Sequence, residues 1–312
     1  MRALAALLAL LTVAPAAVAR ASGTDAKLRV VATIPDLADL TREVGGAHVD
    51  VSSIARGKEN LHNVLARPSH LVALSKADAL VQVGLSMEMS FVPGLLEGCG
   101  NPKVRPGGVG FISVSDGWQP IQVPEVLSRQ GGDLHPQGNP HMNIDPRAGR
   151  HIAGRICEGL SRVAPQWQAE FEANRDAYLA RLAPAEARWR EMAAHWRGRK
   201  LVAYHQEYNY LVEDYGLVLV GNLEVKPGIP PTPNHLAGLI EGMKREGCDV
   251  IVTALWSHND FVARVAEATG AKVVELPNMC GGLPGTDTWI GMMDLVHARL
   301  AEAFGTPVPA RD

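Results

Sequence analysis

Short apolar segments alternate with longer, helix-like segments along most of this chain, and the alternation occurs twice. Strands separated by helices and short loops predict βαβ units, a mostly parallel sheet and right-handed crossovers. Residues 147–196 separate the two alternating regions. There, Trp167, Phe171 and Tyr178 recur at near-helical spacing among many charges. We therefore expect an α/β fold of two similar lobes, with mostly parallel sheets flanked by helices, joined by a helical linker. Pro184 leaves open whether this linker is one bent helix or two helices.

The individual elements follow from local pattern. Residues 116–146 lack periodicity and are rich in Gly, Pro, Gln and His, so we expect a long loop of the kind that is often functional. The expected strands are 28–33, 49–54, 79–83, 111–114, 201–204, 217–220, 249–253 and 272–276. The expected helices outside the linker are 35–44, 67–76, 207–215, 235–246, 260–269 and 288–304.

The first residues are typical of a secretory signal peptide. A charged start is followed by an apolar run over residues 3–13 and by small residues up to Ala21. Pro15 and Arg20 interrupt the run too early for a membrane anchor, which needs about 20 apolar residues. No Cys follows the run, which disfavours a lipid anchor, and cleavage is expected after Ala19 or Ala21. The sequence thus predicts an exported, periplasmic protein. The predicted divisions are a signal peptide (1–21), an N-terminal lobe (22–146), a helical linker (147–196) and a C-terminal lobe (197–312).

Charge and cysteine content exclude several classes. The chain has 30 Lys and Arg against 33 Asp and Glu, whereas a nucleic-acid-binding protein normally carries a basic surface. None of the four cysteines, Cys99, Cys157, Cys248 and Cys280, forms a C-x-x-C pair, which argues against thiolate metal centres. In an oxidising compartment the even number permits disulfides, and Cys248 and Cys280 flank two successive predicted strands. Buried free thiols are the alternative.

Three histidines fall where a ligand site is expected. His62 follows the second predicted strand, His141 lies near the end of the long loop, and His205 follows the strand 201–204. Ligands of parallel sheets bind at the carboxyl ends of strands, and imidazole is the commonest metal ligand. No H-E-x-x-H pattern is present. The pattern suggests a shared metal, although surface or core histidines are the common alternative, and His48, His151, His195 and His297 are better explained in that way.

Several stretches resemble the extracytoplasmic receptors of zinc and manganese ABC importers, the ZnuA-like group. They include Val30–Asp36, Asn60-Leu61-His62, Asn139-Pro140-His141 and Ala203-Tyr204-His205, and the resemblance extends from Leu28 to Phe304. It implies two lobes joined by a long rigid helix, with His62, His141 and His205 as metal ligands. It also implies a non-enzymatic, monomeric receptor that captures zinc and passes it to a membrane permease with its ATPase. A periplasmic metallochaperone is a further partner that the resemblance allows.

The sequence departs from this family at the fourth ligand. The family usually supplies an acidic group after a late strand, but Glu275–Cys280 contains no Asp there. Asp287, Asn278 or a water molecule is expected to complete the shell. The His-rich insertion of many zinc receptors is reduced to Asp133-Leu134-His135-Pro136. His135 is expected to be a solvated loop residue or a weak capture site.

Ligand type favours zinc. Three neutral nitrogens with at most one carboxylate or water suit tetrahedral Zn²⁺, whereas Mn²⁺ prefers more oxygen ligands. A manganese receptor of the same family is the nearest alternative. A three-histidine zinc hydrolase, with Glu207 as general base, is the enzymatic alternative. Binding is expected to weaken as the pH falls through the ordinary imidazole pKa of about 6.5.

Overall fold

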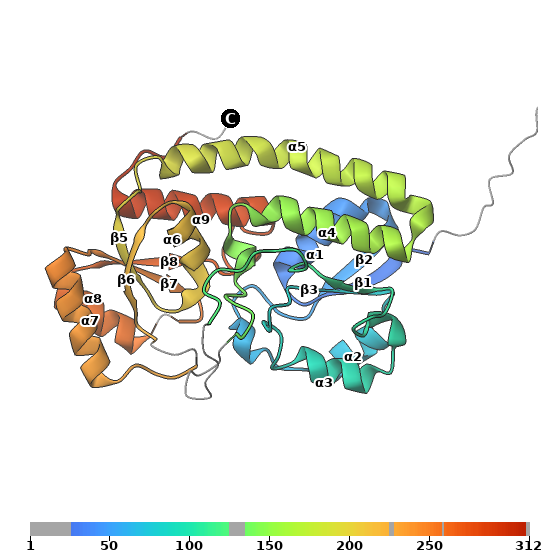
Figure 1. The fold of residues 1–312 in the computed structure, drawn as a ribbon, viewed down its shortest axis with the longest axis horizontal. Coiled ribbons are helices and arrows are strands. Elements are labelled where there is room, and N and C mark those ends of the chain that lie inside the picture. The colour runs from blue at the N-terminus through green and yellow to red at the C-terminus, as the bar shows by residue number, and fades with distance from the viewer. Residues whose placement is uncertain (1–25, 125–134, 225–227, 258, 310–312) are drawn as a thin grey trace, which may run out of the picture.

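The computed structural model describes residues 26–124, 135–224, 228–257 and 259–309. The predicted signal peptide, 1–21, lies outside these residues. Two four-stranded, all-parallel sheets form the centres of two lobes (Figure 1). Their orders, β2-β1-β3-β4 and β6-β5-β7-β8, are the same topology repeated. The strands are β1 (Leu28–Ala32), β2 (Val49–Ser53), β3 (Ala79–Gln82), β4 (Phe111–Ser113), β5 (Lys200–Ala203), β6 (Val218–Asn222), β7 (Val250–Ala254) and β8 (Lys272–Leu276).

Helices cover both sheets. In Figure 1, α2 and α3 lie below the N-terminal sheet, α7 and α8 lie beside the C-terminal sheet, and α4, α5 and α9 form the upper layer. Among the described residues, no helix is both long and apolar enough to cross a membrane. The helices are α1 (Pro35–Gly45), α2 (Pro68–Ser75), α3 (Val92–Cys99), α4 (Ala148–Val163), α5 (Gln168–Ala193), α6 (Asn209–Asp214), α7 (Pro233–Glu246), α8 (Asp260–Thr269) and α9 (Trp289–Phe304).

One long helix, α5, joins the lobes. It packs against α4 on the N-terminal side and against α9 on the C-terminal side (Figure 1). Its 26 residues span about 39 Å at 1.5 Å per residue. Trp189 anchors it, because its indole N–H donates to Asp294 Oδ1 at 2.7 Å and its ring stacks on His297. The expected two-lobed α/β fold with a long connecting helix is therefore confirmed.

Pro184 lies inside α5 without ending it. The proline removes the hydrogen bond that Ala180 would otherwise accept, and both residues are exposed, so water satisfies that carbonyl. Pro184 left open whether the linker is one bent helix or two helices. The structure shows that α5 continues through Pro184 and that a separate helix, α4, precedes it.

One helix was not expected from the sequence, and one question that the sequence left open is resolved. Helix α3 was not expected, because Pro93, Gly94 and Gly98 obscure its pattern; the proline occupies a first-turn position, where a missing N–H costs nothing. The open disulfide question resolves as free thiols, since all four cysteines are buried and unpaired. Cys248 and Cys280 belong to two different apolar clusters.

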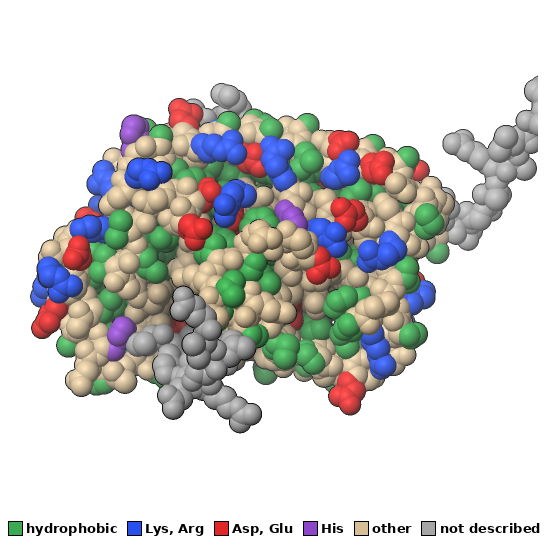
Figure 2. All heavy atoms as spheres, in the orientation of Figure 1, with side chains coloured by type: hydrophobic (Ala, Val, Ile, Leu, Met, Phe, Trp, Pro, Cys, Tyr) green, Lys and Arg blue, Asp and Glu red, His purple; other side chains and the backbone are tan. Residues whose placement is uncertain are grey.

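The exposed face in Figure 2 mixes charges of both signs. Basic and acidic side chains alternate over the upper part of the molecule, where α5 lies, and neither sign forms a broad patch on this face. Arg181 pairs with Glu43 of α1, and Arg150 with Glu186, so part of this charge ties α4 and α5 to their neighbours.

Candidate metal centre

His62 and His141 are presented by the same local device. His62 lies in a 3₁₀ turn, Leu61–Asn63, and its backbone N–H donates to Asn60 Oδ1 at 2.9 Å. His141 precedes a second 3₁₀ turn, and its N–H donates to Asn139 Oδ1, also at 2.9 Å. An asparagine two residues before the histidine thus forms an Asx turn in each loop. The turn fixes the backbone at the residue whose ring must point inward.

His205 comes from the other lobe. It follows β5 directly, with extended backbone, and precedes a short 3₁₀ turn. His62 follows β2 of one sheet and His205 follows β5 of the other, so the two rings meet at the junction of the lobes. Asn139 strengthens this junction, since its amide N–H also donates to the backbone oxygen of Gln206 at 3.0 Å.

The three imidazoles converge on one point. His205 Nε2 lies 3.2 Å from His62 Nε2 and 3.1 Å from His141 Nε2. The ring centroids are 5.1–5.3 Å apart, and the rings are steeply inclined to one another. Four nitrogens at about 2.0–2.1 Å from a tetrahedral Zn²⁺ would be separated by about 3.3 Å. The observed separations match an edge of that tetrahedron.

A buried carboxylate orients His205. Glu224 Oε2 lies 2.6 Å from His205 Nδ1, and Glu224 Oε1 accepts the N–H of Gly228 at 2.9 Å. The carboxylate accepts a hydrogen bond from Nδ1–H, which leaves the lone pair of Nε2 free to bind a cation. A carboxylate–histidine pair of this kind fixes the tautomer and raises the basicity of a metal ligand.

Burial keeps two rings of the cluster, those of His62 and His141, neutral. It lowers the pKa of His62 to about 3, with smaller contributions from His205 and His135. The pKa of His141 is likewise well below its ordinary value, again mainly through burial and then through the neighbouring rings. Imidazoles must be unprotonated to bind metal, so these rings are ready to act as ligands at neutral pH.

A fourth histidine joins the cluster. The ring centroid of His135 is 5.1 Å from that of His62 and 6.4 Å from that of His141. One ring nitrogen from each of these three residues lies within 4.8 Å of the others. His135 Nε2 is buried and has no hydrogen-bond partner. Burial lowers the pKa of His135 to about 4. The sequence left His135 as a solvated loop residue or a weak capture site, and its partly buried ring beside His62 and His141 does not fit a fully solvated residue.

The other side chains that the sequence suggested for this site differ in their exposure and in their hydrogen bonds. Asp287 is exposed and lies near Cys280. Asn278 is buried between the loops of the first two histidines: its amide N–H donates to the oxygen of Glu59 at 3.2 Å, and its Oδ1 has no partner. Glu207 is buried, accepts the indole N–H of Trp256 at 2.5 Å, and has its pKa raised by burial to about 7.

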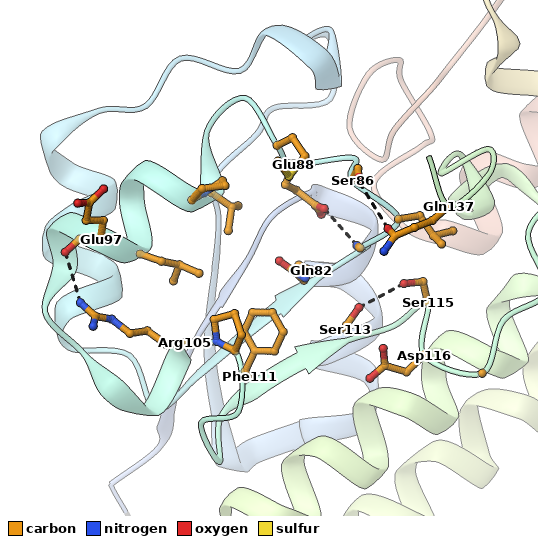
Figure 3. Close-up of a pocket in the computed structure, with 18 residues that line it drawn as sticks. Gln82, Ser86, Glu88, Glu97, Arg105, Phe111, Ser113, Ser115, Asp116 and Gln137 are labelled. Carbon is orange, nitrogen blue, oxygen red and sulfur yellow. Dashed lines mark hydrogen bonds between the residues drawn. The ribbon is translucent and has the colours of Figure 1, made fainter. Parts of the chain in front are cut away.

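A separate cavity of about 850 Å³ opens in the N-terminal lobe (Figure 3). Apolar side chains of α3 line one wall, and Gln82, Ser113 and Ser115 line the opposite one. None of its described lining residues is a histidine, and Ser86 and Gln137 face each other at its edge (Figure 3).

Comparison with known proteins places the chain among metal-uptake receptors. A family model described as "Zinc-uptake complex component A periplasmic" (ZnuA) matches residues 30–303. The chain is 26% identical over 222 residues to the zinc-binding lipoprotein AdcA of Streptococcus pneumoniae serotype 4, covering 71% of this chain and 44% of AdcA. It thus spans less than half the length of that relative.

Two further matches bear on the metal and the fold. The iron ABC transporter substrate-binding lipoprotein MtsA of Streptococcus pyogenes serotype M1 is 24% identical over 223 residues, covering 70% of this chain and 69% of MtsA. A zinc-bound crystal structure of a ZnuA deletion mutant superposes with a TM-score of 0.74 at 23% identity, covering 92% of this chain and all of the other. That structural likeness concerns the fold alone.

Proposed function

Because the chain belongs to the ZnuA family of periplasmic zinc-uptake components, we propose that it is an extracytoplasmic receptor that binds Zn²⁺ between its lobes and delivers it to an ABC importer. The family is one of solute-binding receptors rather than enzymes. In this proposal the ion is cargo that is bound and released unchanged.

One observation carries the proposal. The Nε2 atoms of His62, His141 and His205, drawn from both lobes, lie 3.1–3.2 Å apart along two of their three edges. Two of the rings are almost fully buried, at 2% exposure each. Imidazole nitrogens at this spacing are arranged as the ligands of a shared zinc ion would be.

The donor set favours zinc over manganese. All three proposed ligands are imidazoles, and among the described residues Asp287, the acidic candidate nearest the expected position, is exposed. Mn²⁺ prefers oxygen ligands, whereas nitrogen ligands suit Zn²⁺. The relatives include both zinc-binding and iron-transport proteins, so selectivity is the part of the proposal that most needs measurement.

For delivery, the family implies a membrane permease with its ATPase. A periplasmic metallochaperone is an additional partner that this proposal allows but does not need. We propose that the mature receptor acts in the periplasm as a monomer after removal of the signal peptide.

Titration of the chelator-stripped protein with Zn²⁺, in competition with a chromogenic chelator, tests the proposal. We expect one tight site in the wild type and a loss of at least about tenfold in affinity, or 1.4 kcal/mol, in His141→Ala. His195→Ala is the matched control, since His195 is exposed and follows the C-terminal end of α5. Circular dichroism would establish that each variant is folded.

Two results would contradict the proposal. Wild-type protein that binds no Zn²⁺ tightly would refute the receptor, and unchanged affinity in His141→Ala would refute the ligand assignment. Ester or peptide hydrolysis by the zinc-loaded wild type, lost in Glu207→Gln, would favour the enzymatic alternative instead.

A further inference from the structure

We propose that His135 is the fourth nitrogen ligand of the bound ion and that the left-handed turn at Leu85–Ser86 positions it. This inference rests on the proposed function, because it concerns the same ion. It replaces the water or oxygen donor expected from the sequence with an imidazole from the loop that precedes His141.

The first step is that the ring of His135 has a nitrogen without a hydrogen-bond partner. His135 Nε2 is buried, yet no donor or acceptor contacts it. A buried polar atom without a partner costs roughly 1–3 kcal/mol, so such atoms in a native fold call for an explanation. The neighbouring rings are His62 and His141, and binding a shared cation would satisfy the nitrogen.

The second step is the position of the ring relative to the other ligands. His62 and His141 belong to two close groups, one with His205 and one with His135. The second group is looser, with ligand atoms within 4.8 Å, against the roughly 3.3 Å expected between nitrogens of a zinc tetrahedron. A rotation of the His135 side chain of about 1–2 Å at its tip would close this difference, a scale typical of rotamer adjustment.

The third step is the support behind the ring. The backbone of Ser86 is hydrogen-bonded to His135, and the Ser86 hydroxyl donates to Gln137 Oε1 at 3.4 Å (Figure 3). Leu85 and Ser86 have φ values of 52° and 65°, a conformation that residues with a side chain rarely adopt. Two successive left-handed residues cost energy, and such strain persists where the surrounding structure fixes it.

Buried Glu88 fixes that turn. Its carboxylate accepts the backbone N–H groups of Val83 at 2.7 Å and Gly84 at 3.1 Å, and the hydroxyl of Thr33 at 2.7 Å. Glu88 is 4% exposed, so these hydrogen bonds are shielded from water. Glu88 thus fixes the strained Leu85–Ser86 turn, and Ser86 in turn contacts His135 and Gln137.

A fourth imidazole would close the coordination sphere. Structural zinc sites have four protein ligands, whereas a site with three ligands keeps an open position for water. Four neutral nitrogens also select against Mn²⁺ more strongly than three nitrogens with water. The predicted consequence is a site that holds zinc without a ligand that small anions could displace.

Cobalt-substituted full-length protein tests this directly, because Co²⁺ reports its coordination through visible absorption. We expect added azide to leave the spectrum of the wild type unchanged and to alter that of His135→Ala, where an exchangeable position opens. Zinc affinity in His135→Ala should fall by about tenfold or more, since loss of outer partners alone costs about 10–100-fold. His195→Ala should behave as the wild type.

Two further variants sharpen the test. Ser86→Gly keeps the left-handed turn and should preserve resistance to azide, whereas Ser86→Val disfavours it and should admit azide. Asn278→Ala tests the rival donor, the unpaired Oδ1 of Asn278.

The outcomes separate cleanly. Azide access in the wild type, or a cobalt spectrum in His135→Ala identical to that of the wild type, overturns the assignment of His135. A spectral change in Asn278→Ala alone moves the fourth position to that residue and also overturns it. A wild type that binds neither Co²⁺ nor Zn²⁺ would instead refute the receptor function itself.

Discussion

Replacing Glu224 by Gln removes the charge behind His205 without changing the size of the side chain. In the native site the two carboxylate oxygens accept from two different donors, His205 Nδ1 at 2.6 Å and the Gly228 N–H at 2.9 Å. A glutamine offers one oxygen and one NH₂ group, so one of these donors must face another donor. If the NH₂ group faces His205, the imidazole must move its proton to Nε2, and the metal-binding lone pair is lost.

The magnitude follows from burial. Both side chains are shielded, with His205 at 2% and Glu224 at 8% exposure, so water cannot replace the lost hydrogen bond. An unsatisfied buried group costs about 1–3 kcal/mol, and loss of an outer-shell partner costs about 10–100-fold in metal affinity. When the NH₂ group faces His205, both penalties fall on the metal-binding form of the ring. We therefore expect Glu224→Gln to weaken zinc binding by about 100-fold, or about 2.7 kcal/mol.

Chelator competition at pH 7 measures this change, and Glu246→Gln is the matched control. Glu246 lies in the same lobe, carries the same charge and is exposed beside Lys200. We expect the control to leave the dissociation constant for zinc unchanged. A folded Glu224→Gln protein whose zinc affinity stays within about twofold of the wild type, against the 10–100-fold expected, would show that the carboxylate does not tune His205 and would refute this reasoning.

Three further predictions concern stability. Zinc at 100 times its dissociation constant should stabilise the fold by about 2.7 kcal/mol and raise the Tm by about 4–5 °C; a zinc-independent Tm in calorimetry would contradict this. The pKa of His62 is lowered to about 3 in the folded protein, so near pH 5–6.5 the unfolded chain binds more protons at this residue than the folded chain does. The metal-free wild type should therefore lose more stability between pH 7 and 5, measured by urea denaturation, than His62→Gln does, and equal losses would argue against this. Asp36, whose pKa is raised to about 7, opposes the trend equally in both proteins. Gly57→Ala should destabilise the fold by about 1–3 kcal/mol, because the added Cβ would lie 2.4 Å from the backbone oxygen of Cys280 in the other lobe. Gly94→Ala is the control, since open space surrounds that position. Similar chemical-denaturation midpoints for the two variants would contradict the close approach.

Much of the fold could be predicted because the local signals agree with one another. Every strand of the structure overlaps an expected one, since buried parallel strands appear as compact apolar runs between turn residues. The order of the strands within each sheet could not be predicted in the same way, because pairing depends on contacts between segments far apart. Helix α3 was missed for a local reason, its Pro and Gly content, and Pro184 misled because exposure of the neighbouring carbonyl decides whether a helix tolerates proline.

The three histidines of the site could be identified from the sequence, whereas the residue that orients His205 could not. His62 and His141 each follow an asparagine by two residues, and the structure gives that spacing a cause in the two Asx turns. His205 follows a strand end, where ligand sites of parallel sheets lie. The partner of His205 was not recognisable in advance, because Glu224 is 19 residues away and meets the ring only through the register of β5 and β6.

His135 shows where sequence reasoning reaches its limit. Nothing adjacent to it in the chain distinguishes it from a solvated loop residue, since exposed Pro136 and Gln137 follow it. Its placement depends on a turn about 50 residues earlier, whose strained backbone is held by a buried carboxylate. The information that makes this histidine a candidate ligand is therefore distributed among Ser86, Glu88 and the loop itself. A site assembled from separate loops can reveal its inner ligands through local motifs, while the ligand that closes it is visible only once the loops are brought together.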